Sequence, residues 1–153
     1  MISKQELVDG IRFAGKRAAA AAQNTKDWDH QLAHQWTSGD AFRHIAGTAG
    51  AASGLYPLFD AGVLSGIGSD RIAESNAATI SGMAEKTREE VIQAILDGQN
   101  ASADFIAGLD EADLAKVVKL GGHEMEKAGI VAQTWIHHAI AHAYEASARW
   151  PIT

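Results

Sequence analysis

Three helix-start signals are the feature of this chain that most constrains its fold. In each signal, a serine or threonine precedes an acidic residue by three positions, so that each side chain can accept a hydrogen bond from the backbone N–H of the other. Apolar residues at helical spacing follow every signal. The three pairs are Ser3 with Glu6, Thr37 with Asp40, and Thr87 with Glu90. They predict three helices, each beginning directly after its serine or threonine.

The residues around these signals indicate how far the helices extend. The first helix is expected to end near Gln23 and the second near Phe59. A fourth helix is expected from about Lys127 to Arg149, because Pro151 cannot continue it. An alanine-rich composition with only two prolines supports a helical fold.

Two stretches between the predicted helices lack a long apolar stripe. Residues 60–83 are rich in glycine, serine and asparagine, which indicates a long connection with room for a short helix. Residues 109–126 indicate a turn with a short helical piece that ends at a pair of glycines. Four main helices with one long crossover predict an all-α fold, a four-helix bundle, in a single domain spanning residues 1–153.

Composition excludes several classes of function. The formal net charge of −6 argues against nucleic acid as a partner, because no basic stripe is present to neutralise phosphates. No apolar run approaches the ~18 residues of a membrane span, and the first residues lack the layout of a secretory signal. The absence of cysteine removes disulfides, thiolate nucleophiles and sulfur ligands. We therefore expect a cytoplasmic protein that acts on a small molecule and binds neither nucleic acid nor membrane.

Histidines are concentrated on the last predicted helix. His138 and His142 are four residues apart and therefore lie on one face of a helix. His44, on the second predicted helix, shares its face with small residues that allow another helix to approach closely. Metal sites in bundles are built in the core from facing helices, and three protein ligands leave a fourth position open, as in catalytic zinc sites. His44, His138 and His142 are thus the candidate metal ligands.

Structural roles for the same residues remain open at this stage. A single histidine on an apolar face, such as His44, is more often a packed core residue than a ligand. Pairs of histidines four apart also arise by chance, and His30 with His34 form a second one, which we interpret as part of a connection. Glu145 follows His142 by three positions and is a candidate hydrogen-bond partner or catalytic base. It is equally a candidate for a solvated carboxylate near the end of a helix.

Several segments resemble the DinB-like superfamily. The stretch W-T-S-G-D-A-F-R-H-I-A-G, from Trp36 to Gly47, resembles the family's second-helix signature, and H-A-I-A-H lies where its last helix carries an H-x3-H pair. K-T-R-E-E-V-I-Q-A-I and G-L-D-E-A-D-L are also similar to the family, in the same order along the chain. The chain departs from the family at Ala143 and Tyr144, where a further histidine or arginine is common.

This resemblance implies more than the spacing alone. It implies an up-and-down four-helix bundle with a long connection between helices 2 and 3, related to the N-terminal domain of mycothiol-dependent maleylpyruvate isomerase. It also implies that His44, His138 and His142 hold zinc, nickel or a similar divalent ion. A homodimer is a further expectation.

Three functional hypotheses follow. The first is a metal-dependent transferase or isomerase in which the ion activates a low-molecular-weight thiol. The second is metal-assisted hydrolysis in the same site, and the third is a non-catalytic metal-binding protein of the stress response. A haem or di-iron bundle is disfavoured, because di-iron sites use paired Glu-x-x-His motifs, which the candidate ligand faces lack.

Overall fold

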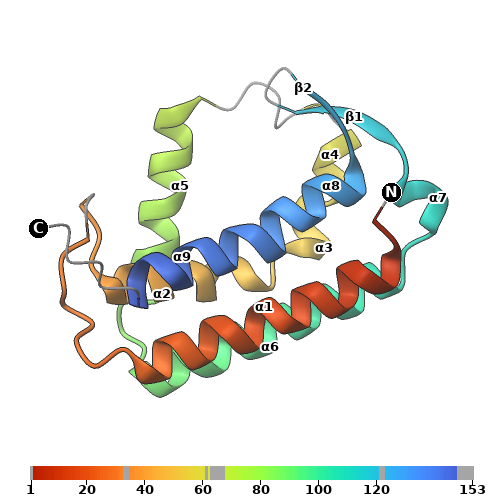
Figure 1. The fold of residues 1–153 in the computed structure, drawn as a ribbon. Helices are drawn as coiled ribbons and strands as arrows, with labels where there is room; N and C mark the ends of the chain where they lie inside the picture. The colour runs from red at the N-terminus through yellow and green to blue at the C-terminus, as the bar shows by residue number, and fades with distance from the viewer. Residues whose placement is uncertain (1, 33–34, 61, 63–67, 121–122, 148–153) are drawn as a thin grey trace, which may run out of the picture.

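The computed structural model describes residues 2–32, 35–60, 62, 68–120 and 123–147. These residues are mostly helical, with one short β-hairpin, so the fold is all-α as predicted (Figure 1). The longer helices are α1 (Lys4–Asn24), α2 (Ser38–Ala49), α5 (Ser69–Gly82), α6 (Arg88–Ala107) and α9 (His138–Ser147). The short elements are α3 (Ala52–Leu55), α4 (Pro57–Asp60), α7 (Glu111–Leu114), β1 (Val117–Leu120), β2 (His123–Glu126), α8 (Lys127–Val131) and the π-helix η2 (Ala132–His137). No described helix is both long and apolar enough to cross a membrane.

All three predicted helix-start signals are confirmed. The side chains of Ser3, Thr37 and Thr87 each accept a hydrogen bond from the backbone N–H three residues later. In return, the acidic residue of each pair accepts from the backbone N–H of the capping residue. Helices α1, α2 and α6 therefore begin where the sequence predicts.

The predicted second helix is wrong in its length, because α2 ends at Ala49 rather than near Phe59. In a continuing helix the carbonyl of Ala49 would accept from an N–H one turn later. Instead it accepts from the buried hydroxyl of Ser102, at a distance of 2.5 Å. Two four-residue helices, α3 and α4, then carry the chain onward. The last carbonyl of α2 is thus satisfied by a side chain on α6, and Gly50 is the C-cap residue.

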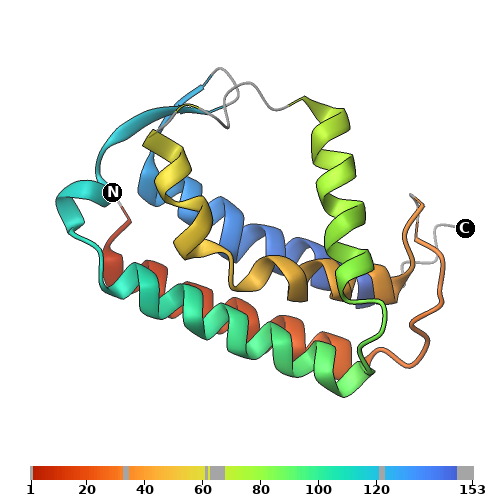
Figure 2. The same ribbon diagram turned by 180° about the vertical axis from the view of Figure 1, so that it is seen from behind.

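Helix α5 occupies most of the predicted long connection and is longer than the short helix allowed for there. None of its residues is buried, and it packs mainly against α2. At the contact, a Cβ atom on Gly47 would overlap the side chain of Thr79, so a glycine is required for this approach. Both views show α5 standing away from α1 and α6, which lie side by side (Figures 1 and 2).

The segment 109–126 contains the predicted short helical piece, which is α7, followed by a hairpin of β1 and β2 that was not predicted. Strand β1 pairs antiparallel with β2, with Val118 opposite Met125. These two residues and Leu120 pack against the apolar core, whereas Lys119 and Glu124 are exposed. Apolar and polar residues alternate on β1 from Val118 to Leu120, and a glycine pair follows, which is a signal for a hairpin.

The last helix is divided into three parts. Helix α8 passes into the π-helix η2, and regular α-helix resumes at His138. The predicted end at Arg149 lies outside the described residues.

Two buried apolar clusters pack against this helix, one around Trp135 and Phe59 and the other around Phe42 and Ile95. Helix α1 contributes to both clusters and packs against α6 and α9, while α2 also packs against α6 and α9.

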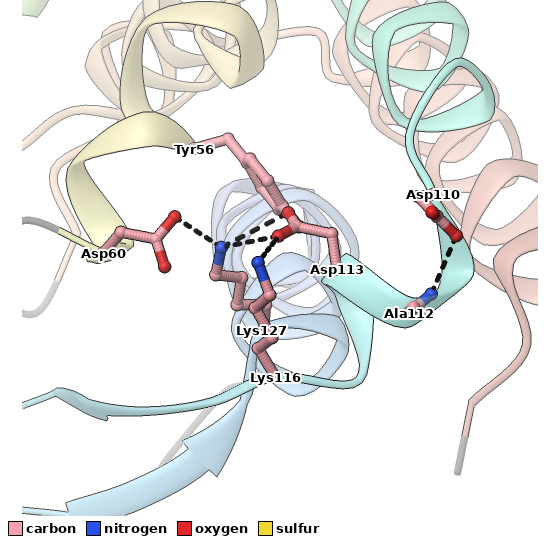
Figure 3. A network of polar contacts seen from close by, with 7 residues as sticks. All are labelled: Tyr56, Asp60, Asp110, Ala112, Asp113, Lys116 and Lys127. Carbon is pink, nitrogen blue, oxygen red and sulfur yellow. Dashed lines mark hydrogen bonds and ion pairs between the residues drawn. The ribbon is translucent and has the colours of Figure 1, made fainter.

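A buried lysine ties α4 and α7 to the start of α8 (Figure 3). Lys127 is completely buried, and its Nζ lies 2.6 Å from Asp60 Oδ2 and 3.2 Å from Asp113 Oδ2. Tyr56 donates its hydroxyl to Asp113 Oδ2 at 2.7 Å. Hydrogen bonds from Lys116, Tyr56 and Lys127 hold the pKa of Asp113 well below its ordinary range. The charged lysine is therefore matched by two carboxylates, as a buried cation requires.

Candidate metal centre

Helices α2 and α9 bring three histidine rings together. His44 lies in the middle of α2, and His138 and His142 lie one turn apart in the first half of α9. One ring nitrogen from each histidine lies within 4.8 Å of the other two. The ring centroids are 4.7 to 5.1 Å apart, and each pair of rings meets edge to face. The structure thus places together the three residues that the sequence nominated.

The arrangement of donors fits a divalent ion. His44 Nε2 and His138 Nε2 are 2.9 Å apart, and in a tetrahedral zinc site with bonds of ~2.0–2.1 Å the ligand nitrogens are about 3.3 Å apart. Small side-chain rotations would therefore bring all three nitrogens onto one ion. Three imidazole nitrogens suit zinc and other transition metals rather than magnesium or calcium, which take oxygen ligands.

Burial keeps two of the three imidazoles neutral. His44 is 2% exposed, and burial with the neighbouring His138 and His142 lowers its pKa from 6.5 to about 3. The pKa of His138 is lowered to about 4, first by burial and then by His142. A neutral imidazole offers the lone pair that a metal needs. His44 Nδ1 is buried and has no hydrogen-bond partner among the described residues, an unpaired polar group of a kind frequent at functional sites.

Two further side chains fix the positions of the histidine rings. Glu145 Oε2 lies 3.2 Å from His142 Nδ1, which leaves Nε2 of that ring for an ion. A carboxylate in this position orients a metal-binding histidine and raises its basicity. The Trp36 ring packs at 4.9 Å from His44 and 5.4 Å from His142, between ring centroids. Trp36 therefore covers one side of the histidine cluster.

The π-helix η2 lies directly before the two ligands on α9. Short π-helical segments are rare and are found frequently at functional sites. Because η2 ends at His137 and regular helix begins at His138, the four-residue spacing of His138 and His142 keeps both rings on one face. The π-helical segment was not predicted from the sequence.

A cavity of about 550 Å³ opens beside the histidines. His44 and His138 form part of its wall, and most of the rest is apolar, with Leu55, Phe59 and Ile130 among the contributors. The cavity lies between α2, the short helices that follow it, α5, and the α8–η2 segment. An ion held by the three histidines would thus be next to a space that admits a small molecule.

The other histidines that the structure describes are not part of this cluster. His30 is exposed in the connection between α1 and α2, and His34 lies outside the described residues. His123 is exposed at the start of β2, and His137 is exposed at the end of η2. The threonine one turn after His44, Thr48, donates its hydroxyl to the carbonyl of His44 at 2.9 Å and lines the cavity.

No family model, curated protein or solved structure matches this chain. The function is therefore inferred from the site. Three imidazoles with one side open to a cavity can hold an ion and leave it accessible to a second molecule. A chemically inert structural site would instead have four protein ligands.

Proposed function

We propose that this chain is a divalent-metal-dependent enzyme of thiol chemistry, a transferase or isomerase, with His44, His138 and His142 as the metal ligands. One observation carries the proposal: three imidazoles, two of them held neutral by burial, converge at the wall of an apolar cavity. The resemblance to the DinB-like superfamily supports it. We extend that resemblance to the fold and interpret α1, α2, α6 and the α8–α9 segment as an up-and-down four-helix bundle.

Each residue of the site has a defined task in this proposal. The three histidines bind zinc, nickel or a similar ion. Glu145 keeps the His142 ring in the orientation that directs its other nitrogen toward the ion, and Trp36 keeps water from one side of the cluster. The cavity holds the second substrate. When bound by neutral ligands, such an ion keeps its full charge and lowers the pKa of a thiol that reaches its open position.

The reaction class that suits these groups is the addition of a thiol to an activated double bond. Sulfur forms a bond to one carbon and the proton of the thiol is delivered to the other, so no oxidant or further reactant is needed. Reversal after rotation about the resulting single bond isomerises the substrate, whereas retention of sulfur completes a transfer.

Cobalt substitution tests the proposal. The chain contains no cysteine, so a sulfur-to-cobalt charge-transfer band can come only from an added thiol. We expect 2-mercaptoethanol or cysteine to produce this band with the cobalt protein, and His138→Ala to abolish it. The thiol should also add to a small electrophile faster than in buffer.

Other outcomes would select the other hypotheses. If the cobalt spectrum does not change when thiols are added but changes with pH near 7, as expected for a metal-bound water that ionises, the result would support metal-assisted hydrolysis instead of thiol chemistry. A spectrum that responds to neither would leave a metal-binding protein without catalytic function.

A further inference from the structure

The cavity beside the histidines is lined by uncharged and mostly apolar side chains among the described residues. The residues that line it are His44, Thr48, Leu55, Phe59, Ile72, Asn76, Leu120, Ile130, Gln133, Thr134 and His138. No lysine, arginine, aspartate or glutamate is among them. The neighbouring stretches outside the described residues, 61, 63–67 and 121–122, contain no charged amino acid in the sequence either. A charged group on a bound molecule would therefore be desolvated there without an ion partner, which is costly.

The polar side chains of the cavity are mostly engaged within the protein. Thr48 and Thr134 donate their hydroxyls to backbone carbonyls of their own helices, at 2.9 and 2.8 Å. Gln133 Oε1 lies 3.4 Å from His137 Nδ1. Asn76, on α5, makes no side-chain hydrogen bond to any residue that the structure describes. Its amide can thus both donate to and accept from a ligand, whereas Gln133 has only its Nε2 without a hydrogen bond to a described residue.

We propose that this cavity binds an uncharged, mostly apolar small molecule that presents one neutral polar group, such as a carbonyl oxygen, to Asn76. This molecule is the electrophilic substrate of the thiol chemistry proposed above, so its role in the reaction rests on that proposal. Its binding does not. The apolar wall supplies affinity through burial of the ligand, and the absence of charged side chains disfavours carboxylates and phosphate esters wherever they do not reach the ion.

A matched pair of fluorescent probes tests the charge preference. N-phenyl-1-naphthylamine is uncharged, and 8-anilino-1-naphthalenesulfonate has the same rings with one added sulfonate. Binding is measured with metal-free protein at pH 8, so that no ion attracts the sulfonate and failure of the metal proposal does not affect the result. The uncharged probe should bind at least ~10-fold more tightly, because the sulfonate would be buried unpaired.

Two single substitutions locate the bound probe. Ile72 lines the cavity and is 51% exposed, so Ile72→Lys should be tolerated and should tighten binding of the anionic probe several-fold. Phe13 on α1 is 56% exposed and lies outside the cavity, and Phe13→Lys serves as the control that should change neither probe. Thermal unfolding followed by circular dichroism checks that both variants fold.

A second measurement tests the role of Asn76. The ketone 1-acetonaphthone and the hydrocarbon 1-ethylnaphthalene compete with the uncharged probe. In Asn76→Leu, the ratio of the two affinities should shift by ~5-fold toward the hydrocarbon. A shift of this size corresponds to the net contribution of one hydrogen bond. An unchanged ratio would remove Asn76 from the proposal.

The proposal as a whole has clear contrary outcomes. It is overturned if the sulfonate probe binds wild-type protein as tightly as the uncharged probe, or if neither binds at micromolar concentration. It is also overturned if Phe13→Lys shifts probe binding as much as Ile72→Lys, because the probes would then lie outside the cavity.

Discussion

His44 Nε2 lies 2.9 Å from His138 Nε2, although 94 positions separate the two residues in the sequence. Without an ion, the two facing nitrogens can share a single proton, and Nδ1 of His44 is left without a partner among the described residues. An ion between the rings would use both lone pairs.

We expect one divalent ion per chain, and we expect it to raise the melting temperature, because a ligand that binds only the folded state stabilises it by mass action. His44→Ala and His142→Ala should abolish tight binding. His30→Ala is the matched control, because His30 is exposed and does not belong to the cluster, and His34→Ala should also be without effect. Elemental analysis and calorimetric titration measure the binding. Loss of the ion in the His30 variant but not in His44→Ala would reverse the assignment.

Stability of the metal-free protein should fall as the pH is lowered from about 6.5 toward 4. Burial lowers the pKa of His44 to about 3 and of His138 to about 4 in the folded state, from 6.5. In this window the unfolded chain binds protons that the folded chain does not, so acid favours unfolding. Urea unfolding at pH 7.5, 6 and 5 measures the effect.

Removing one buried histidine should weaken this pH dependence. His44→Gln keeps a polar side chain but removes a proton-binding group, so its unfolding free energy should decline less between pH 7.5 and 5 than that of the wild type. His30→Gln should leave the decline unchanged. Equal slopes for wild type and His44→Gln would mean that His44 titrates normally in the folded protein.

Glu145→Gln should weaken metal affinity by ~10–100-fold, the usual effect of removing a carboxylate that orients a metal-binding histidine. The change keeps the size of the side chain and removes its charge next to His142 Nδ1. Glu124→Gln, on the exposed face of β2, is the control. If Glu145 acts as the catalytic base instead, affinity for the ion will be unchanged and the rate alone will fall.

Lys127→Met should cost about 1–3 kcal/mol of stability, because Asp60 and Asp113 lose their buried cation, although both carboxylates keep some contact with solvent. Lys116→Met removes another partner of Asp113, but Lys116 is largely exposed, so the cost should lie between about 0 and 1 kcal/mol. Chemical denaturation compares the two variants. Similar costs would show that burial of Lys127 does not matter to the network in Figure 3.

Local signals in the sequence predicted the helix starts and the candidate ligands. Each helix-start signal works within four residues, so no distant contact is needed to form it. His138 and His142 both lie in regular helix after η2, so their spacing was a reliable guide to a shared face. The place of His44 beside them depended on the packing of α2 against α9, which the sequence indicated only through small residues on the same face.

Features that depend on contacts between residues far apart in the sequence were not predicted. The end of α2 combines a local signal that was not used, the C-cap glycine Gly50, with a hydrogen bond from Ser102, 53 residues away in the sequence. Helix α5 buries none of its residues, so its sequence has no strong apolar stripe from which its length could be predicted. Its position depends instead on the contact of Thr79 with Gly47 on α2. The hairpin of β1 and β2 could have been predicted locally, because the sequence contains both the alternation of apolar and polar residues and the glycine pair that favour a hairpin.

Gly98→Ala should destabilise the protein by ~1–3 kcal/mol through overpacking. A Cβ atom at this position of α6 would lie 2.6 Å from Ala49 Cβ and 2.8 Å from the backbone nitrogen of Gly50, and a backbone atom cannot move aside as a flexible side chain can. The contact lies at the end of α2, where Ser102 of α6 also donates its hydroxyl to the carbonyl of Ala49.

Gly129→Ala is the matched control for this last substitution. Gly129 lies in α8 and nothing is within 4 Å of its Cβ position, so alanine there should stabilise the protein by up to ~1 kcal/mol through helix propensity. Thermal and urea unfolding of the two variants should give opposite signs. If both are stabilising, the approach of α6 to α2 is looser than the Ala49–Gly98 contact requires.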